Sequence, residues 1–443
     1  MSKKFYILTL GCQMNKNDSE RIAGLCMALG LEQVIKSENA DLIIVNTCSV
    51  RQTAEERIFG YFEDWQKYRQ KNPNLVVAIT GCMAGRDLDG KIKARLKGVD
   101  LFFPTKDLVH LPEWLAQKWG SDFGLGELED YLLIAPYRIN KFQVFVSIQT
   151  GCDNFCTYCV VPYARGREKN RRVSDIIEEI KIAINNNAKE VTLLGQVVNH
   201  YIAPDKESFN KNNPFVGVNG DDFAALLWEI NQIQGEFRVH FTAADPQYFS
   251  DAQIEALKLP KQVNYLHLPA QSGDDEILRK MNRKYNAKYY LELIKKIKNA
   301  KPEIALGTDI IVGFCSETDA QFQRTVDLYR ECDFDISYHA MYSERSGTAA
   351  AKAFKDDVPK EIKKQRWDTL QKLMEETVLR KNQKYLNQTV RVLVEKCDDG
   401  VCLGNTDELK LAEFSGAPDL IGKFVNIKIN FAGKWILRGV IVN

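Results

Sequence analysis

Three cysteines in the middle of the chain have the spacing of ligands for one metal centre. Cys152, Cys156 and Cys159 follow a C-x3-C-x2-C pattern. They come directly after the apolar run 142–148, which predicts a strand. A cubane iron–sulfur cluster held by only three protein thiolates keeps one iron open to a substrate or cofactor, as a three-ligand catalytic zinc site does. The alternatives are a zinc knuckle that lacks its fourth ligand and a chance cluster of cysteines.

The loop, with Tyr158 before its last cysteine, resembles the cluster loop of the radical S-adenosylmethionine (SAM) enzymes. The resemblance implies that SAM chelates the open iron of a 4Fe–4S cluster. It also implies that one electron cleaves SAM to a 5′-deoxyadenosyl radical, and that Tyr158 packs near the SAM adenine.

Three more cysteines, Cys12, Cys48 and Cys82, each follow a short apolar run, and these runs are residues 5–10, 41–46 and 75–80. Helical patterns separate them, at 18–29 and 51–71. This alternation predicts a parallel sheet, whose strands end at one edge, where ligands gather. We therefore expect these cysteines to hold a second cluster with one open iron. The alternative is three buried core thiols that happen to follow strands.

The motifs around these cysteines are Gly11-Cys12-Gln13-Met14-Asn15, Asn46-Thr47-Cys48-Ser49-Val50-Arg51 and Gly81-Cys82-Met83-Ala84. They resemble the three cysteine motifs of the methylthiotransferases, specifically the tRNA-modifying, MiaB-type branch. The resemblance implies an auxiliary 4Fe–4S cluster whose open iron carries the sulfur to be inserted. Gly85 departs from the family, which more often has Gln at that position.

The middle of the chain predicts a partial parallel (β/α)6 barrel. Its six strand-like runs are 142–148, 190–194, 237–242, 263–268, 304–312 and 335–342, and helical patterns include 175–188, 222–233, 287–299 and 320–332. Active groups of parallel barrels lie at the carboxyl ends of the strands, which is where the cluster loop begins. The polar insertion 203–220 is typical of a surface loop.

Further SAM contacts are expected on two of these strands. Gln196 follows the second strand, and Thr308 and Gly313 lie on the fifth, where small residues let the backbone approach a ligand closely. Tight packing of strands and loops explains these residues equally well. The resemblance to the methylthiotransferases extends over nearly the whole barrel.

A basic stretch follows the cluster loop. Its members are Arg165, Arg167, Lys169, Arg171 and Arg172. Lys and Arg bind nucleic acids mainly through phosphates, so this stretch predicts an RNA contact beside the reaction site. The alternative is a solvated turn whose arginines pair with nearby acids.

The last part of the chain predicts a small antiparallel β-barrel after a long helix, 360–385. Its short strands are 390–395, 401–404, 409–412, 423–431 and 434–442. The pattern and position resemble the TRAM domain, an OB-like RNA-binding barrel. On composition alone, a protein-interaction barrel is an equal alternative.

The 443 residues exceed one compact domain. We predict an α/β chain with three domains, at 3–120, 138–370 and 376–443. The formal net charge is +1, so nucleic-acid binding has to come from local patches rather than from a polycationic chain.

The 11 cysteines follow no secretion signal, which favours metal or redox chemistry over disulfides. No apolar stretch has the length of about 20 residues that a membrane helix requires. We therefore expect a cytoplasmic monomer. The cysteines expected to be bystander thiols are Cys26, Cys315, Cys332, Cys397 and Cys402.

Together the resemblances imply a methylthiotransferase that converts N6-isopentenyladenosine beside the tRNA anticodon to its 2-methylthio derivative. They imply two 4Fe–4S clusters and two SAM molecules, and we expect flavodoxin or ferredoxin as electron donor. The sulfur donor stays unknown. Near alternatives are threonylcarbamoyladenosine of tRNA or a ribosomal-protein aspartate as substrate. From another class, a zinc-containing RNA-binding protein without catalysis would also use cysteines and basic residues.

Overall fold

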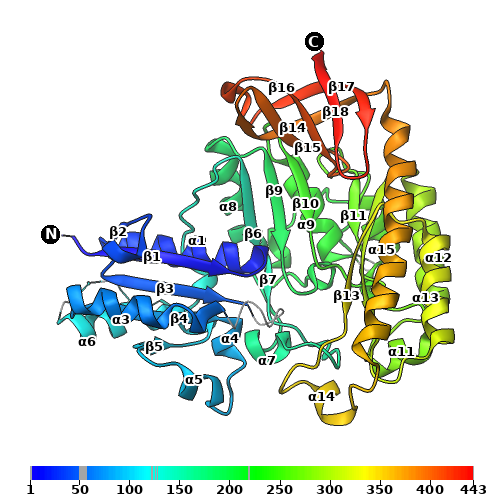
Figure 1. The fold of residues 1–443 in the computed structure, drawn as a ribbon. Helices are drawn as coiled ribbons and strands as arrows, with labels where there is room; N and C mark the ends of the chain where they lie inside the picture. The colour runs from blue at the N-terminus through cyan, green and yellow to red at the C-terminus, as the bar shows by residue number, and fades with distance from the viewer. Residues whose placement is uncertain are drawn as a thin grey trace.

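The computed structural model describes residues 2–48, 57–120, 123–124, 126, 128–217 and 220–442. Three units follow one another along the chain, and Figure 1 shows the first and the last at different sides of the central one. The helix expected over 51–71 begins outside the described residues, and its described part contains α3 (Phe62–Lys71). Among the described residues, no helix has the combined length and apolarity needed to cross a bilayer.

The first unit is a parallel five-stranded sheet in the order β2-β1-β3-β4-β5. The strands are β1 (Lys4–Leu10), β2 (Glu32–Gln33), β3 (Leu42–Thr47), β4 (Val76–Gly81) and β5 (Leu101–Phe102). The buried residues of α1 (Gln13–Ala28) and α6 (Leu111–Trp119) pack on one face of the sheet, and Trp65 of α3 packs on the other. The expected parallel sheet is confirmed, with β2 and β5 as additional short edge strands.

The second unit is a partial barrel of two parallel three-stranded sheets, β10-β9-β6 and β11-β12-β13. Its strands are β6 (Gln143–Ser147), β9 (Glu190–Leu194), β10 (Arg238–Phe241), β11 (Tyr265–His267), β12 (Ala305–Val312) and β13 (Ile336–Met341). A parallel bridge between Val239 and Gln262 links the two sheets. This arrangement confirms the predicted fold class of the middle of the chain.

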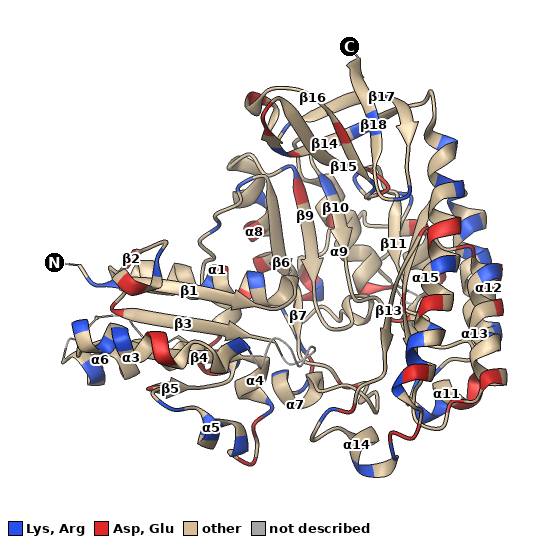
Figure 2. Cartoon of the chain, in the orientation of Figure 1, with Lys and Arg blue, Asp and Glu red and all other residues tan. Residues whose placement is uncertain are grey.

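Helices cover the outside of the barrel. They are α8 (Val173–Asn185), α9 (Asp222–Gln232), α12 (Ala287–Ala300), α13 (Asp319–Cys332) and the long α15 (Lys360–Asn382). Their apolar faces and the outward residues of the strands form the largest core cluster. Figure 2 shows charged residues concentrated on the helices and loops, while most strand positions are uncharged. This distribution is typical of strands that are buried on both sides.

The third unit is a closed barrel in the order β14-β15-β16-β18-β17. Its strands are β14 (Thr389–Asp398), β15 (Val401–Thr406), β16 (Leu411–Ser415), β17 (Phe424–Ala432) and β18 (Leu437–Val442). Four of the five pairings are antiparallel, and β16 and β18 run parallel. The parallel pair closes the barrel, so the expected small barrel is confirmed but is not antiparallel throughout.

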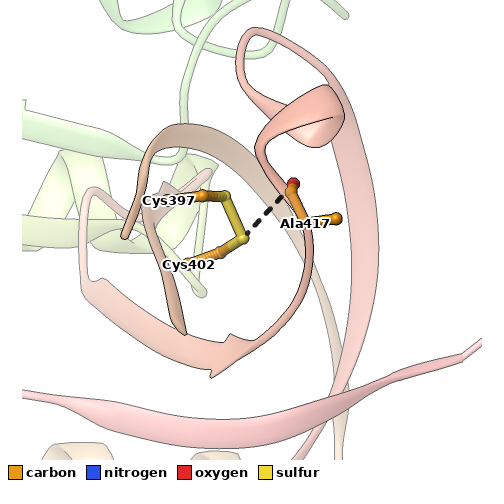
Figure 3. Close-up of a disulfide and its surroundings, with 3 residues drawn as sticks. All are labelled: Cys397, Cys402 and Ala417. Carbon is orange, nitrogen blue, oxygen red and sulfur yellow. Dashed lines mark hydrogen bonds between the residues drawn. A yellow bond between two sulfur atoms is a disulfide. The ribbon is translucent and has the colours of Figure 1, made fainter. Parts of the chain in front are cut away.

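Cys397 and Cys402 form a disulfide in this barrel (Figure 3), which corrects the expectation that both are bystander thiols. They face each other across the β14–β15 hairpin, and their Cα atoms are 4.0 Å apart. The two-residue turn Asp399–Gly400 sets this register, because Asp398 pairs with Val401. Cysteine spacing alone gave no hint of it.

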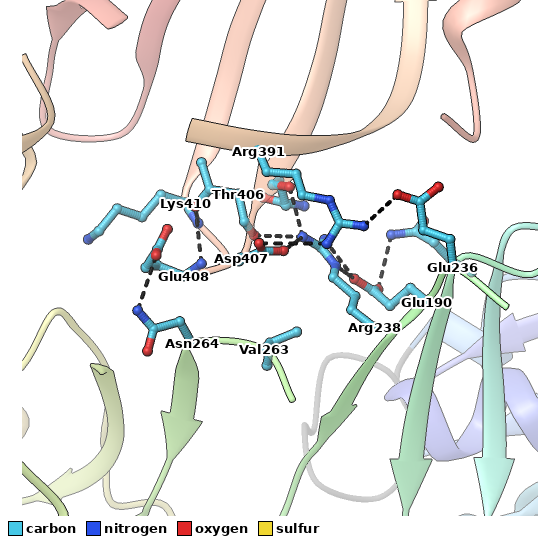
Figure 4. Close-up of polar contacts among 12 residues, drawn as sticks. Glu190, Glu236, Arg238, Val263, Asn264, Arg391, Thr406, Asp407, Glu408 and Lys410 are labelled. Carbon is cyan, nitrogen blue, oxygen red and sulfur yellow. Dashed lines mark hydrogen bonds and ion pairs between the residues drawn. The ribbon is translucent and has the colours of Figure 1, made fainter. Parts of the chain in front are cut away.

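The closed barrel contacts the amino-terminal ends of the central strands, as Figure 4 shows. Arg238, the first residue of β10, forms ion pairs with Glu190 of β9 at 2.7 Å and with Asp407 at 3.2 Å. Lys410 reaches Asp335, directly before β13, at 3.2 Å. The third unit therefore lies at the end of the central barrel opposite the loops that follow the strands.

A buried carboxylate joins the first unit to the central barrel. Glu179 of α8 forms ion pairs with Arg21 of α1 at 3.0 Å and with Arg171 at 2.8 Å, and it also pairs with Arg138. Burial opposes ionisation of Glu179, but the three guanidinium groups outweigh it and lower its pKa to about 2. Asn17 of α1 adds hydrogen bonds to Ser147 and to the Phe145 carbonyl of β6.

Replacing Glu179 with Gln should destabilise the fold by about 3–5 kcal/mol at neutral pH, because three buried cations lose their anion. The folded pKa lies below the ordinary value of 4.5, so the stabilisation is complete above pH 4.5 and declines as the pH falls toward 2. Denaturant titrations at several pH values should therefore show the variant approaching the wild-type stability as the pH falls.

The matched control is Glu178→Gln, which alters an exposed neighbour on the same helix. Its denaturation midpoint should follow that of the wild type at every pH. Equal stability of Glu179→Gln and wild type at pH 7 would contradict the role of this carboxylate.

Candidate functional site

The first three cysteines lie at the ends of three adjacent strands. Cys12 follows β1 and is the N-cap of α1, Cys48 follows β3 directly, and Cys82 is the first residue of α4 (Cys82–Gly85) after β4. Because β1, β3 and β4 are neighbours in the sheet, their carboxyl ends share one edge. The structure thus brings together three residues that are more than thirty positions apart in the sequence.

Buried polar side chains tie the three cysteine loops together. The side-chain amide of Asn15 donates to the Asn46 side chain and to the Thr47 carbonyl, both at 3.0 Å, while its oxygen accepts from the Cys12 amide at 3.2 Å. The Thr47 hydroxyl donates to the Thr80 carbonyl at 2.6 Å. These positioning residues belong to the cysteine motifs, but sequence reasoning assigned them no role. The signal that could have identified them is the presence of polar residues at the ends of apolar strands.

Gly81 is required where β4 meets α4. Its φ of +97° is strained for any other residue, and a Cβ here would stand 2.3 Å from the Thr47 carbonyl oxygen. The backbone of the Cys82 loop therefore packs directly on the end of β3.

The second group of cysteines lies on the loop that follows β6 and β7 (Gln149–Thr150). The Cys152 amide donates to the Gly166 carbonyl at 3.1 Å, and the Cys159 amide donates to the Cys156 carbonyl at 2.9 Å. The Thr157 amide and hydroxyl donate to the carbonyls of Met281 and Lys280. The loop is thus held both by its own turns and by the segment after α11 (Asp275–Lys280).

Two side chains of that segment complete the support. The Asn282 amide donates to the carbonyls of Asn154 and Phe155, both at 3.1 Å. Arg283 donates to the Cys156 sulfur at 3.2 Å and forms an ion pair with Asp245 at 2.9 Å. Hydrogen bonds to ligand sulfurs are one means by which proteins adjust iron–sulfur centres. This contact gives Arg283 a physical role beside the cluster loop.

All six cysteines line one cavity of about 1070 Å³. Its volume lies just above the range of about 300–1,000 Å³ that is usual for ligand pockets. The cavity begins among the cysteines, continues along the inner side of the barrel strands and reaches the third unit at Leu411 and Trp435. The two groups of cysteines therefore face a shared space.

A contact between the two cysteine loops fixes their relation. Helix α7 (Val161–Arg165) follows the second loop and packs against α4, which begins with Cys82. At Gly85 a Cβ would stand 2.0 Å from the Ala164 carbonyl oxygen. This close approach accounts for glycine at the position where the resembling family more often has Gln.

Arg165 and Arg171 lie in the protein interior, which corrects their assignment as RNA contacts. The Arg165 side chain is 4% exposed and forms an ion pair at 2.6 Å with Asp18, which is 0% exposed. Its guanidinium also lies beside Cys82 and partly offsets the burial that raises the pKa of that thiol. Arg171 is buried against Glu179.

The other three basic residues stay available to solvent. The side chains of Arg167, Lys169 and Arg172 are 78%, 60% and 61% exposed. Each has an acidic neighbour, with Arg167 3.0 Å from Asp153 and Lys169 2.7 Å from Asp130. Exposed pairs of this kind contribute little to stability, so these side chains can exchange their partners for phosphates at low cost.

The four expected SAM contacts divide into two pairs. Tyr158 and Gln196 line the cavity, and Oε1 of Gln196 is buried without a hydrogen-bond partner among the described residues. Thr308 and Gly313 are absent from the described lining. The Thr308 hydroxyl donates to the Leu268 carbonyl, and Lys363 fills the space beside Gly313. Strand and loop packing, the alternative given for these residues, therefore accounts for Thr308 and Gly313, and their assignment as SAM contacts stays a prediction.

The donor set fits iron–sulfur chemistry. Burial raises the pKa of Cys152 to about 11 and that of Cys159 to about 12, so without metal both thiols keep their protons at neutral pH. Metal binding would release these protons, and thiolates are the soft ligands that iron–sulfur clusters prefer. Each cysteine group also has one buried arginine beside a sulfur, Arg165 or Arg283, which would offset the negative charge of bound thiolates.

Within the described part of the chain, no three Cys, His, Asp or Glu side chains converge as ligands of a single metal ion would. A cubane carries each thiolate on a different iron, so its ligands need not surround one point.

Each of the three units matches a known family or domain. Residues 4–104 match the uncharacterized protein family UPF0004, residues 146–329 the radical SAM superfamily, and residues 383–442 the TRAM domain. A tRNA-2-methylthio-N(6)-dimethylallyladenosine synthase of Geobacillus kaustophilus (strain HTA426) is 41% identical, covering 100% of this chain and 82% of the relative. The synthase of the same name from Bacillus subtilis (strain 168) is 40% identical, covering 99% and 86%.

A solved structure shares the fold at low sequence identity. It is the radical SAM methyltransferase TsrM from Kitasatospora setae with cobalamin and a [4Fe-4S] cluster bound. The TM-score is 0.52 at 13% identity, and the match covers 79% of this chain and 77% of that chain.

Replacing Arg165 with Gln tests whether this residue is structural. The buried Asp18 carboxylate would lose its counter-charge, so we expect a loss of about 3–5 kcal/mol in denaturant unfolding of the metal-free protein. The control is Arg167→Gln, two residues further on, which should change stability by less than about 1 kcal/mol. An Arg165→Gln protein of normal stability but reduced RNA affinity would restore the original RNA-contact assignment.

Proposed function

The chain belongs to the family of tRNA-2-methylthio-N(6)-dimethylallyladenosine synthases, and we propose that it adds a methylthio group to N6-isopentenyladenosine (N6-dimethylallyladenosine) beside the anticodon of tRNA. Membership of the radical SAM superfamily implies a [4Fe–4S] cluster and SAM. The observation that carries the proposal is the shared cavity, because both groups of three cysteines face it. A reaction that joins a radical centre to a sulfur donor needs both to reach one substrate atom.

The two groups of cysteines divide the work. Cys152, Cys156 and Cys159 would hold the cluster of the superfamily, with SAM against Tyr158 and Gln196. Cys12, Cys48 and Cys82 would hold a second, auxiliary [4Fe–4S] cluster. When bound, the first cluster and SAM would supply the 5′-deoxyadenosyl radical, which removes the hydrogen at C2 of the adenine as 5′-deoxyadenosine, and the auxiliary cluster would supply the sulfur, methylated by a second SAM, that takes the place of this hydrogen.

The protein residues orient and shield this chemistry. The first unit packs against β6 through Asn17 and Ser147, which puts its cysteines next to the cluster loop. Arg165 and Arg283 place buried positive charge beside the ligand sulfurs. Because groups that contact the ligands of a metal centre affect its metal affinity and redox potential, both arginines belong to the proposed site.

RNA has to deliver its base into the barrel, which requires the base to leave its stack. Arg167, Lys169 and Arg172 form an exposed basic group directly after the cluster loop, and we propose that they bind RNA phosphates. The TRAM domain at the other end of the cavity would bind the same RNA.

The relatives favour the isopentenyladenosine substrate over the two near alternatives, threonylcarbamoyladenosine and a ribosomal-protein aspartate, because they carry the name of the first activity. The same relatives favour an enzyme over a zinc-containing RNA-binding protein. A flavodoxin or ferredoxin as electron donor, a cytoplasmic location and a monomeric state stay predictions.

Cysteine replacements should separate the two clusters. After anaerobic reconstitution the wild type should contain about eight iron atoms per chain, and replacing all of Cys12, Cys48 and Cys82 with Ala should leave about four. That variant should still cleave SAM, while replacing Cys152, Cys156 and Cys159 should abolish cleavage. Neither variant should form the 2-methylthio nucleoside, as measured by mass spectrometry of digested tRNA.

Cys332→Ala is the control, because this buried thiol is the last residue of α13, belongs to the main core and is not part of the cavity lining. It should keep about eight iron atoms and the activity. Zinc in place of iron in the wild type, or unchanged 2-methylthio-isopentenyladenosine in a deletion strain, would refute the proposed function.

A further inference from the structure

The inner side of the central barrel carries rings and polar groups where a packed core would carry branched aliphatic residues. Val239 and Phe241 of β10 point outward into the main core, so His240 between them points inward. Tyr265 and His267 of β11, Asp309 of β12 and Tyr338 of β13 line the same cavity as His240 and the six cysteines. We call His240, Tyr265, His267 and Asp309 the inner wall.

Polar contacts hold three residues of the inner wall, Tyr265, His267 and Asp309, in one arrangement. The Tyr265 hydroxyl lies 3.2 Å from Nδ1 of His267, and Nε2 of His267 lies 3.2 Å from an Asp309 carboxylate oxygen. Gly307 makes room for this arrangement, because a Cβ there would stand 2.0 Å from the Tyr265 hydroxyl. Both ring nitrogens of His267 are thus engaged, and its ring cannot turn without breaking a contact.

The rings form a continuous surface. The centroids of His240 and Tyr265 are 5.7 Å apart, and those of His267 and Tyr338 are also 5.7 Å apart. Tyr338 is 59% exposed and lies on β13, which is an edge strand because no pairing joins it to β6 within the described residues. The ring surface therefore runs from the open side of the barrel to its interior.

One polar atom of the inner wall has no partner. His240 is only 8% exposed, and its Nε2 is buried without a hydrogen bond among the described residues. Burial lowers the pKa of His240 to about 3, so its imidazole is neutral at physiological pH. A buried polar atom without a partner is costly, and a ligand that supplies the partner recovers that cost.

We propose that the inner wall is the contact surface for the purine base that the RNA inserts, with the base against the Tyr265 and His267 rings and a base nitrogen hydrogen-bonded to His240. The chemistry fits a purine, because a planar base has two faces that stack on rings and an edge that bonds to polar atoms. This inference rests on the proposed function and assigns the substrate contacts within the same cavity.

The position of the inner wall separates it from the expected SAM contacts. Tyr158 and Gln196 lie on loops at the carboxyl ends of the strands, next to the cysteines. His240 lies within β10, and Tyr265 is the first residue of β11. Both therefore lie deeper in the barrel than the loops that carry Tyr158 and Gln196. A base against the inner wall and SAM against Tyr158 would therefore occupy neighbouring parts of one cavity.

The test compares His240→Ala with wild type in the cluster-loaded full-length protein. Two synthetic anticodon stem-loops serve as probes, one with N6-isopentenyladenosine and one with plain adenosine at the target position. We expect the KM for the modified stem-loop to rise about tenfold, and the affinity for both stem-loops in anisotropy titrations to fall, because both carry the purine edge that His240 would bind. His240→Asn, which keeps a polar group, should recover part of the loss.

His339→Ala is the matched control. Nε2 of His339 is also buried and without a partner among the described residues, but its ring packs against Trp367 on the outer side of β13. This variant should bind both stem-loops as the wild type does. Iron content and circular dichroism of every variant identify any that fail to fold, and Asp309→Asn then replaces His240→Ala with the same expected loss.

The outcomes separate the two claims. A wild type that forms no 2-methylthio nucleoside refutes the proposed function. An active wild type with His240→Ala and Asp309→Asn at wild-type KM and wild-type affinity for both stem-loops refutes only the inner wall. A rise in the KM for SAM in place of that for the stem-loop would assign the inner wall to the cofactor and also overturn the inference.

Discussion

The buried Glu179 carboxylate is the constraint on which the site depends. It lies on a barrel helix, and its three arginines come from α1, from the segment before β6 and from the segment before α8. An ionised carboxylate is stable in such a place only while its counter-charges stay close, so the contact resists displacement of the first unit. This geometry keeps two separately folded cysteine groups on one cavity.

The two cysteine groups are supported in the same way. In each, an arginine that is almost fully buried lies beside a sulfur and is held by an aspartate, Asp18 with Arg165 or Asp245 with Arg283. Arg165 comes from the helix after the second loop but serves the first group, so the electrostatics of one centre depend on the packing of the other. Small residues at the α4–α7 contact, Gly85 and Ala164, make this sharing possible.

Different parts of the protein lie at the two ends of the central barrel. The cysteine loops lie at the carboxyl ends of its strands, and the small closed barrel lies at the amino ends, fixed by Arg238 and Lys410. The cavity connects them along an inner wall of rings, with Tyr338 at the open edge. An RNA that contacts both the small barrel and the basic group after the cluster loop would therefore span this cavity.

The sequence by itself determined the local chemistry and the order of elements. The apolar runs of strand length, the cysteine spacing and the family motifs were enough to predict two groups of cysteine ligands, a parallel barrel and a terminal β-barrel. These properties depend on neighbours along the chain. Only the tertiary structure decided that Arg165 and Arg171 are buried, that Tyr158 and Gln196 line the cavity, and that Cys397 meets Cys402 across a hairpin. Burial, strand register and the partners of a charge arise from residues distant in sequence, so a basic stretch has the same pattern whether its side chains meet phosphate or a buried carboxylate.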